Sequence, residues 1–556
     1  MTIVPNFLAN LLTEYRSEVE HWLSDYLYGQ IVQRAPHHLL VQLKARLDFG
    51  PLEAGCLSFH HQTGPGAKPT HAVNKLVRVL LVKYLYNWSL RETEERLQHD
   101  LVVKWFVGYR VLEQVVDHSQ LERFEQWVQQ HQHRLYFDGI LRQIDQDLPA
   151  ERTAVQIGDT FAMRADAAQE TLVELLRHTS RCLLREIQHG APAVYPALLA
   201  QVDQVLLFGP AEEPLVYFMS AEQKQLQRET TARGAWSLQQ FVTPLLARLA
   251  EPIRVRVQLR VDDLAKILAD EFCLILDAAG QLAQVSLLAP KDKGSYRLCS
   301  ATDPDATARN HGKDSTVGYN ISAAATPLGI IRAIHAATGA SPDQAEVATL
   351  IAEQRQHQAL CPPKLIYDRA AGAGRTRALV KQVSTGQTQL VARIPPSSSP
   401  GRLGPDDFHF DASGALVCPA GQVTTRSYHS NQEEGDVYWF VGADCQNCAL
   451  RPQCRDPKAK PNSLRRLFIS DYQPYIRQAQ SYNQTLLFRA EMHLRPRIER
   501  IIFMLTHYDG ARHARRRGKP WADFQVKMCA TARNIRTWLT YCDRRPAPPL
   551  SQAAGG

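Results

Sequence analysis

The first 150 residues of the chain carry hydrophobic positions at the spacing of helices. Between residues 73 and 84 the apolar positions recur at intervals of three and four, so they share one helix face. Ser89 followed by Glu92 predicts a helix start of the capping-box type. Ser119 followed by Glu122 predicts a second one. We therefore expect a helical N-terminal region, either a helix-turn-helix-like module or a small bundle.

The pattern changes near residue 153. Val155 and Ile157 alternate with other residues and the run ends on Asp159, which predicts a strand that carries a carboxylate to the edge of a sheet. Leucine-rich segments with helical spacing follow within residues 167 to about 300. We interpret this stretch as a helical insertion between the first strand and the rest of its sheet.

Short strand patterns and helix patterns alternate from residue 317. Strands are expected at 317–325, 329–335, 364–368 and 389–394, and helices at 343–358 and 375–382. The third of these strands ends on Asp368. A Pro- and Ser-rich linker at 395–401 interrupts the alternation, and helical patterns resume at 472–507 and 521–540.

This order of elements is that of the ribonuclease H-like fold, an α/β architecture with a mixed sheet flanked by helices. In that fold the first and fourth strands are neighbours, so acids at their ends converge, and a late helix can add a third acid. The chain then divides into a helical N-terminal domain at 1–150, the first part of the core at 151–394 with the insertion at about 167–300, a cysteine-bearing insertion at 395–470, and the C-terminal part of the core at 471–556.

Composition and charge narrow the class of protein. The 556 residues are 44% hydrophobic and 22% charged, and no apolar run is long enough to span a membrane. The N-terminus lacks the basic segment and apolar core of a secretory signal, so we expect a cytoplasmic protein. The net charge is +8, and residues 451–556 hold 21 Lys or Arg against 7 Asp or Glu. This asymmetry predicts either a phosphate-facing surface or a solvated basic tail.

Three acids are candidates for one site in this arrangement: Asp159, Asp368 and Glu499, the last on the late helix. Mg²⁺ takes oxygen ligands and usually combines a few carboxylates with waters and phosphate oxygens. Two such ions activate a nucleophilic hydroxyl and stabilise the leaving oxyanion in phosphodiester chemistry. Asp166 is the alternative to the first acid. Asp343 is a weaker alternative to the second, because it has the place of a helix-start residue.

Four of the 11 cysteines lie in the segment after the linker. Their spacing is C-x26-C-x2-C-x5-C, at Cys418, Cys445, Cys448 and Cys454. Four thiolates can complete a tetrahedral zinc site, which would stabilise a polar segment without an apolar core of its own. The alternative is a set of reduced thiols without metal. We interpret the other cysteines as ordinary buried or surface thiols.

The residues around these acids resemble those of the DDE transposases of bacterial insertion sequences. Residues 159–167, Tyr367 with Asp368 and Gly372, and residues 495–499 are similar to the family's three acid motifs. Further similarity covers residues 90–92, 105–108 and 117–119 near the N-terminus, 303–306, Lys313 and 318–320 in the second-strand region, and 515–518 and Asn534 near the C-terminus.

The resemblance implies a transposase that binds the terminal inverted repeats of an insertion sequence and catalyses metal-dependent strand cleavage and transfer into target DNA. Asp159, Asp368 and Glu499 would bind two Mg²⁺ or Mn²⁺ ions. The helical N-terminal domain would bind DNA, and we expect a homodimer that acts on nucleoid DNA in the bacterial cytoplasm. We assign DNA-phosphate contacts to the basic residues around and after the third acid: Arg495, Arg497, Arg500, Arg512, Arg515, Arg516, Arg517 and Lys519.

Two positions depart from the family's pattern. Many relatives have a tyrosine three residues before the arginine of the third motif and a lysine seven residues after its glutamate, whereas this chain has Met492 and Thr506 there. Two alternatives therefore stay open. One is a catalytically inactive, transposase-derived DNA-binding protein, and the other is a ribonuclease H-like nuclease that ignores the terminal repeats.

Overall fold

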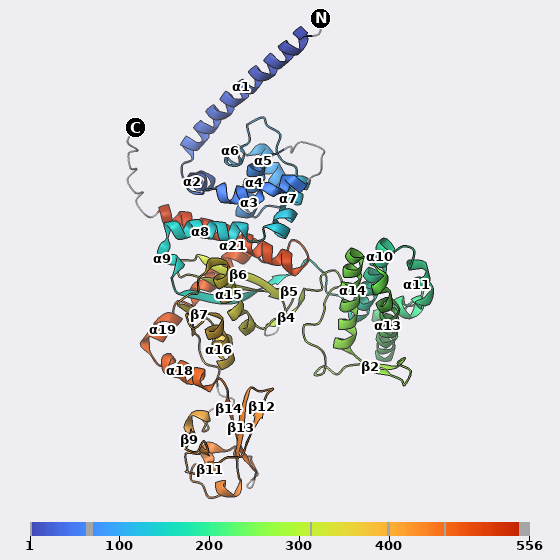
Figure 1. Cartoon of the computed structure of the whole chain (residues 1–556), viewed down its shortest axis with the longest axis vertical. Coiled ribbons are helices and arrows are strands. Elements are labelled where there is room, and N and C mark those ends of the chain that lie inside the picture. The colour runs from blue at the N-terminus through green and yellow to red at the C-terminus, as the bar shows by residue number, and fades with distance from the viewer. Residues whose placement is uncertain (1–2, 63–70, 312–313, 397–400, 461–462, 544–556) are drawn as a thin grey trace.

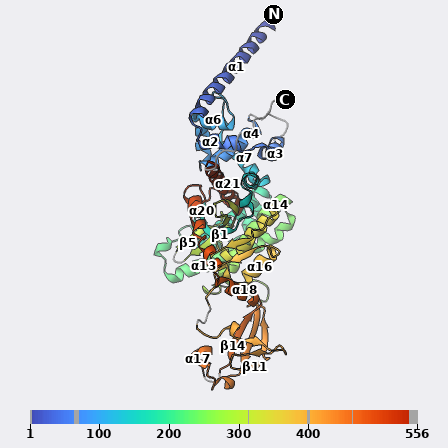
Figure 2. The same cartoon turned by 90° about the vertical axis from the view of Figure 1, so that its left-hand side faces the viewer.

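The computed structural model of the chain describes residues 3–62, 71–311, 314–396, 401–460 and 463–543. Lys313 and residues 397–400 of the expected linker lie outside the described residues. The molecule is long (Figure 1): helix α1 projects from one end, the central sheet lies in the middle, and the small sheets around β9–β14 form the other end. The view turned by 90° shows the same order along the long axis (Figure 2).

The N-terminal region is helical, as its apolar spacing predicts. Its described helices are α1 (Ile3–Arg34), α2 (Leu39–Arg46), α3 (Gly50–Cys56), α4 (Val73–Leu85), α5 (Leu90–His99), α6 (Leu101–Val107), α7 (His118–His131), α8 (Leu135–Asp147) and α9 (Pro149–Arg152). Ser89 caps α5 as expected and accepts a hydrogen bond from the Glu92 N–H at 3.1 Å. The second predicted cap was wrong. Asp117 caps α7 instead, because its carboxylate lies directly before the helix and accepts from the Gln120 N–H at 2.8 Å.

The central sheet is mixed, in agreement with the predicted fold class. Its strands are β1 (Gln156–Arg164), β4 (Thr307–His311), β5 (Asp314–Ala325), β6 (Ile331–Thr338), β7 (Lys364–Ile366) and β8 (Gln389–Val391). The order runs β6-β5-β1-β7-β8, with β4 also paired to β5. β5 runs antiparallel to β1, β4 and β6, whereas β1, β7 and β8 run parallel to one another. Helix α15 (Asp343–Gln358) connects β6 to β7, and helix α16 (Gly374–Val383) connects β7 to β8.

One strand boundary differs from the prediction. β1 does not end on Asp159 but continues to Arg164, because β5 pairs with it along its whole length, from Ile157 opposite Ala325 to Arg164 opposite Gly318. Asp159 therefore lies inside a strand.

The predicted insertion is helical and has a hydrophobic core of its own. Its elements are α10 (Leu172–Gly190), α11 (Tyr195–Gln201), α12 (Gln204–Phe208), α13 (Ala221–Val242), α14 (Glu251–Glu271) and a hairpin of β2 (Phe272–Leu276) and β3 (Leu282–Leu287). The hairpin is absent from the sequence-based prediction. The insertion lies to one side of the sheet, between β1 and β4 in the chain (Figure 1).

The cysteine-bearing segment forms two small sheets at the end of the molecule. Its elements are β9 (His409–Phe410), β10 (Leu416–Val417), β11 (Val423–Thr424), β12 (Ser427–Ser430), β13 (Gly435–Phe440), α17 (Arg451–Cys454) and β14 (Arg465–Ser470). The long helix expected from residue 472 is divided into α18 (Gln473–Asn483), α19 (Leu486–Met492) and α20 (Pro496–His507). Thr485 caps α19 and Pro496 opens α20, so each residue starts a new helix.

The last helix, α21 (Lys519–Asp543), joins the N-terminal helices to the sheet in one hydrophobic core. Buried Asn534 exchanges two hydrogen bonds with the backbone of Ile331, at 2.7 and 2.9 Å, and so acts as an edge partner for β6. This contact explains why an asparagine occurs inside an otherwise apolar helix face. None of the helices in the described part of the chain is long and apolar enough to cross a membrane.

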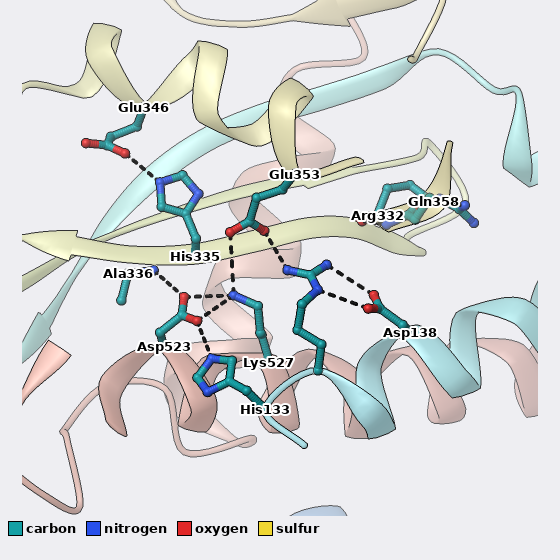
Figure 3. A network of polar contacts seen from close by, with 11 residues as sticks. His133, Asp138, Arg332, His335, Ala336, Glu346, Glu353, Gln358, Asp523 and Lys527 are labelled. Carbon is teal, nitrogen blue, oxygen red and sulfur yellow. Dashed lines mark hydrogen bonds and ion pairs between the residues drawn. The ribbon is translucent and has the colours of Figure 1, made fainter. Parts of the chain in front are cut away.

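A buried polar network also links α21 to α8, α15 and β6 (Figure 3). Lys527 lies 2.7 Å from Asp523 and 3.8 Å from Glu353. His133 lies 2.5 Å from the same Asp523 carboxylate, which also accepts a hydrogen bond from the Ala336 N–H at 2.9 Å. The buried charges of this network are therefore paired with opposite charges, which offsets the cost of removing them from water.

Candidate active site

Asp159 and Asp368 lie at matching positions of two neighbouring strands. β1 and β7 are parallel, and their last paired residues are Ile157 and Ile366. Each acid lies two residues beyond its member of that pair. The structure therefore brings the first two predicted acids to corresponding positions of adjacent strands, just past the point where β7 ends beside β1.

The glycine before Asp159 makes room for the residue before Asp368. A Cβ atom on Gly158 would lie 2.6 Å from the ring of Tyr367, which is fully buried. Because that distance is far below van der Waals contact, only glycine lets the β1 backbone approach the ring so closely. Burial raises the pKa of Tyr367 well above its ordinary value, and the carboxylates of Asp159, Asp343 and Asp368 raise it further. Its hydroxyl lacks a hydrogen-bond partner among the described residues.

Asp159 is a mostly buried acid, with 18% of its side chain exposed. Burial raises its pKa because the carboxylate loses water, and Asp368 and Asp343 add to the rise by repulsion. The Thr160 N–H, at 2.9 Å, and the Arg495 guanidinium oppose the rise. The pKa still lies above the ordinary value, so a cation beside Asp159 and Asp368 would relieve repulsion between them.

Arg495 connects Asp159 to the third predicted acid. Its Nη2 atom lies 3.2 Å from Oδ2 of Asp159, and its Nη1 atom lies 3.5 Å from Oε1 of Glu499. Glu499 belongs to the first turn of α20 and is 58% exposed. The third acid thus lies near the first, and the Arg495 guanidinium contacts both.

The second acid also shapes the turn that follows β7. Oδ1 of Asp368 accepts a hydrogen bond from the Ala370 N–H at 3.0 Å and caps the turn Arg369–Gly372. A Cβ atom on Gly372 would lie 1.9 Å from the carbonyl oxygen of Arg393, so this turn requires glycine. Gly158, directly before the first acid, and Gly372, in the second-acid motif, therefore both serve close packing around the acids.

The sequence patterns did not indicate the polar group behind these acids. Arg309 on β4 donates to the Thr160 hydroxyl at 2.9 Å and lies 3.2 Å from Asp343. Asn320 on β5 donates to the same oxygen of Asp343 at 2.9 Å. Asp343 is the first residue of α15, so its position is near that expected of a helix start. Its pairing inside the protein favours a structural role over a role as the second acid.

The donor set fits a divalent cation by its chemistry. Asp159 and Asp368 offer the oxygen donors that a hard cation such as Mg²⁺ prefers. A cation between them would also relieve the repulsion that raises the pKa of Asp159. Among the described residues, however, no group of three or more His, Cys, Asp or Glu side chains is arranged to hold a metal ion. The guanidinium of Arg495 instead contacts both Asp159 and Glu499.

The basic run after α20 divides into two groups. Arg515 contacts the Asn87 side chain and the Trp88 carbonyl, and Arg516 lies 2.8 Å from the carboxylate of Glu122. These two guanidiniums attach the loop to the N-terminal helices, which supports a structural role for them. The exposed basic side chains of the run are those of Arg512, Arg517 and Lys519.

The same loop lies beside the strand that carries Asp159. The Arg164 N–H at the end of β1 donates to the carbonyl of Arg512 at 3.0 Å. Arg517 donates to the carbonyl oxygen of Asp166 at 2.8 Å. The side chain of Asp166 is exposed beyond the end of β1, away from the paired ends of β1 and β7. Asp159 is therefore better placed than Asp166 to share a site with the second acid.

Residues from the second-strand region hold this basic loop in place. The Tyr319 hydroxyl donates to Asp303 at 2.5 Å, and the Gly518 N–H donates to the other oxygen of Asp303 at 3.2 Å. The Lys519 N–H at the start of α21 donates to Asp305 at 3.0 Å. The residues of the second-strand region therefore have a supporting role: they fix the backbone of the basic loop.

A cleft of ≈ 570 Å³ lies between α20, α21 and the turn that joins β5 to β6. Arg497 and Arg500 line it together with Arg533 and Arg536, which the sequence analysis did not single out. Their i, i+3 spacing on one predicted helix was the available signal. Arg533 lies 2.6 Å from the carboxylate of buried Asp509. Arginine and hydroxyl side chains are the groups that contact DNA phosphates, and the hydroxyls in this cleft belong to Thr537, Thr540 and Tyr541.

The four cysteines of the cysteine-bearing segment line one small cavity, of ≈ 30 Å³. Burial raises the pKa of Cys445, and the other three thiols add to the rise. Cys454 accepts a contact from Nε of Arg465 at 3.4 Å, and Cys418 accepts one from the Gln422 N–H at 3.3 Å. The predicted thiols are therefore near one another, although they are not arranged as a ready metal site among the described residues.

Comparison with known families gives two matches. Residues 30–127 match the family described as Transposase domain (DUF772), and residues 417–539 match the family described as Transposase DDE domain. The second match spans Glu499, the basic run and most of α21, whereas Asp159 and Asp368 lie outside both matched ranges. Neither the curated proteins nor the solved structures contain a significant match.

Proposed function

We propose that this chain cuts and rejoins DNA at the ends of its element. The premise is that it is a DDE transposase of an insertion sequence, as its two family matches indicate. The observation that carries the proposal is the matching position of Asp159 and Asp368 on parallel strands, with Glu499 one contact away through Arg495. These three acids would hold two Mg²⁺ or Mn²⁺ ions.

Divalent ions bound there would supply activation of the attacking hydroxyl and stabilisation of the leaving oxyanion. The protein's own residues have separate tasks. Tyr367 and Gly158 fix the spacing of β1 and β7, and so the spacing of the acids. Arg495 aligns α20 with β1, and its guanidinium is a suitable partner for a phosphate once a cation takes its place between the acids. Catalysis here would rest on positioning and electrostatics.

DNA would follow two basic surfaces that border the acids. One consists of the exposed side chains of Arg512, Arg517 and Lys519, beside β1. The other is the arginine cleft that contains Arg497 and Arg500, on the far side of α20. We propose that both contact phosphates of terminal-repeat or target DNA, in the bacterial cytoplasm at the nucleoid.

An inactive, DNA-binding derivative is the second candidate. The hydroxyl of Thr506, where relatives carry a lysine, donates to the Ile502 carbonyl within α20 at 2.9 Å, so this position supplies no cation. Such a protein would bind element ends without cutting them. A ribonuclease H-like nuclease of another kind would instead cut without regard to the terminal repeats.

We also propose a structural zinc ion in the cysteine-bearing segment. The shared cavity of Cys418, Cys445, Cys448 and Cys454 supports it, because four neighbouring thiolates repel each other unless a cation joins them. Metal analysis of protein purified without added metal tests the proposal. About one zinc per chain, lost in a Cys445→Ser/Cys448→Ser variant, is expected, and a metal-free wild-type protein would contradict it.

The direct test of the main proposal is a strand-cleavage assay. Purified protein is incubated with DNA that carries its element's end and Mg²⁺, and the strands are resolved on a denaturing gel. We expect nicks at the element boundary that disappear in Asp159→Ala, Asp368→Ala and Glu499→Ala, with end binding retained in a mobility-shift assay.

Asp166→Ala is the matched control, because it changes an exposed acid on the same segment and should leave cleavage intact. Binding without cleavage, with Mn²⁺ also tried, would support the inactive derivative. Cleavage that ignores the end sequence would support the other nuclease, and cleavage that survives all three substitutions would reject the proposed acids.

A further inference from the structure

Helix α1 extends away from the rest of the protein (Figures 1 and 2). Its described part carries a stripe of exposed large apolar side chains. Tyr15 is 68% exposed, Val19 46%, Trp22 67% and Tyr26 55%. These four residues follow one another at intervals of four, three and four. Exposed apolar residues are common singly, but a continuous row on a projecting helix marks an interaction surface.

The other face of α1 is attached to the protein's own body. The Tyr28 hydroxyl donates to the Tyr109 carbonyl at 2.8 Å, and the Val111 N–H donates to the Ser24 hydroxyl at 3.1 Å. About two turns further out, Arg110 donates to the Ser17 hydroxyl at 3.2 Å. These hydrogen bonds hold α1 to its own chain by the face opposite the stripe, so the stripe points outward.

The spacing of the stripe identifies the kind of partner. Alternating intervals of four and three residues are the a and d positions of a coiled coil, in which a second helix packs along a narrow seam. A helix that packs on a broad surface needs a wider apolar face. In the sequence the same intervals continue outward to Leu12 and Leu8, whose side chains are not among those described. The partner is therefore another helix with the same seam.

We propose that the α1 helices of two copies of this chain pair as a parallel, in-register coiled coil. The seam has Val19 and Tyr26 at a positions, with Tyr15 and Trp22 at d positions. A second copy supplies the identical seam, so the interface is self-complementary about a two-fold axis.

The charges beside the seam select the parallel arrangement. Glu18 and Asp25 occupy the flanking g positions. In a parallel pair Glu18 faces the partner's Leu23, so no like charges are opposed. An antiparallel pair with the same seam aligned would set Glu18 against the partner's Asp25, which costs stability.

This inference goes beyond the proposed function, because it does not depend on any catalytic residue. A parallel pair would place both bodies at the same end of the coiled coil, and so keep two acid sites within one complex. Two element ends could then be held together.

Disulfide trapping tests both the pairing and its direction. In a parallel, in-register pair each a position faces itself, so Val19→Cys is expected to yield a cross-linked dimer under mild oxidation, read on a non-reducing gel. His21→Cys, on the same helix but off the seam, is the matched control, and the unmodified chain reports background from its 11 native cysteines. Cross-linking of His21→Cys to the same extent as Val19→Cys, or of neither above background, would overturn the proposal.

Sedimentation supplies the second measurement. The unmodified chain is expected to be a dimer and Val19→Glu/Trp22→Glu a monomer, while Glu18→Gln/His21→Ala stays a dimer. Unchanged circular dichroism would show that the body still folds. A dimeric Val19→Glu/Trp22→Glu variant or a monomeric unmodified chain would reject the interface, and a disulfide formed only between Val19→Cys and Trp22→Cys chains would reject the parallel direction.

Discussion

The guanidinium of Arg495 lies 3.2 Å from the carboxylate of Asp159, although the two residues are 336 positions apart in the chain. The same side chain lies 3.5 Å from Glu499, on the next turn of its own helix. Arg495 thus joins the first and third proposed acids and supplies positive charge where a divalent cation would otherwise lie. Metal binding at the proposed acids would therefore be coupled to the position of α20 through one arginine.

Replacement of Arg495 by glutamine should separate these two effects. Cleavage should fall by roughly 100-fold, because the α20 acid loses its alignment with β1. The affinity for Mn²⁺, measured by calorimetry without DNA, should rise, because Asp159 and Glu499 lose their internal counter-ion. Arg489→Gln is the matched control, since it removes the same charge from an exposed position on α19 that takes no part in the proposed site or in either basic surface. Unchanged cleavage together with unchanged Mn²⁺ affinity would exclude the coupling.

Substitution of Gly158 by alanine should damage the site without removing any polar group. The new Cβ atom would lie 2.6 Å from the Tyr367 ring, so β1 and β7 must shift. We expect a loss of about 1–3 kcal/mol of unfolding free energy, as for overpacked cores, and a loss of cleavage. Tyr367→Leu should restore part of the stability in the double variant. Equal stabilities of Gly158→Ala and the unmodified chain in urea denaturation would show that the contact is not limiting.

Local signals in the sequence predicted most of the elements. Helix α15 has the bounds expected of it, because its apolar residues repeat at helical spacing between Pro342 and the left-handed Ala359. The order of strands also followed from the chain, since a sheet of this kind has few possible connections. The confirmed fold in turn accounts for the convergence of Asp159 and Asp368.

Contacts between distant residues could not be predicted in this way. Nothing near Arg309 in the sequence indicates that it pairs with Asp343 behind the acids, and nothing near Arg495 indicates that it contacts Asp159. Local competition also misled the prediction at α7, where Asp117 and Ser119 are both good capping residues and the aspartate prevails. The roles of Asp159, Asp368 and Glu499, and the boundaries of the four domains, stay predictions.

The arginine cleft predicts a specific change in the salt dependence of DNA binding. Arg497→Ala/Arg500→Ala removes two cations from it, so the slope of log affinity against log salt should become shallower by about 1.8. The measurement is a fluorescence-anisotropy titration with element-end DNA at several salt concentrations. Arg254→Ala/Arg256→Ala, on the helical insertion, keeps the same net charge change and should leave the slope unaltered. Equal slopes for both pairs would indicate that DNA does not enter the cleft.

The network around Asp523 predicts a pH-dependent contribution to stability (Figure 3). Burial would raise the pKa of Asp523, but hydrogen bonds and charge from His133 and Lys527 outweigh it and hold the pKa far below the ordinary value. A depressed carboxyl pKa stabilises the fold above the unfolded pKa of about 3.9 and loses that effect as the pH falls through the folded pKa. Asp523→Asn should therefore cost about 3 kcal/mol at pH 7, because it leaves Lys527 buried without its closest partner, and the cost should shrink below about pH 4. Exposed Asp292→Asn is the control for thermal melting across this range, and a cost for Asp523→Asn that is the same at pH 7 and pH 3 would show that the carboxylate charge is not what stabilises the junction of α21 with the sheet.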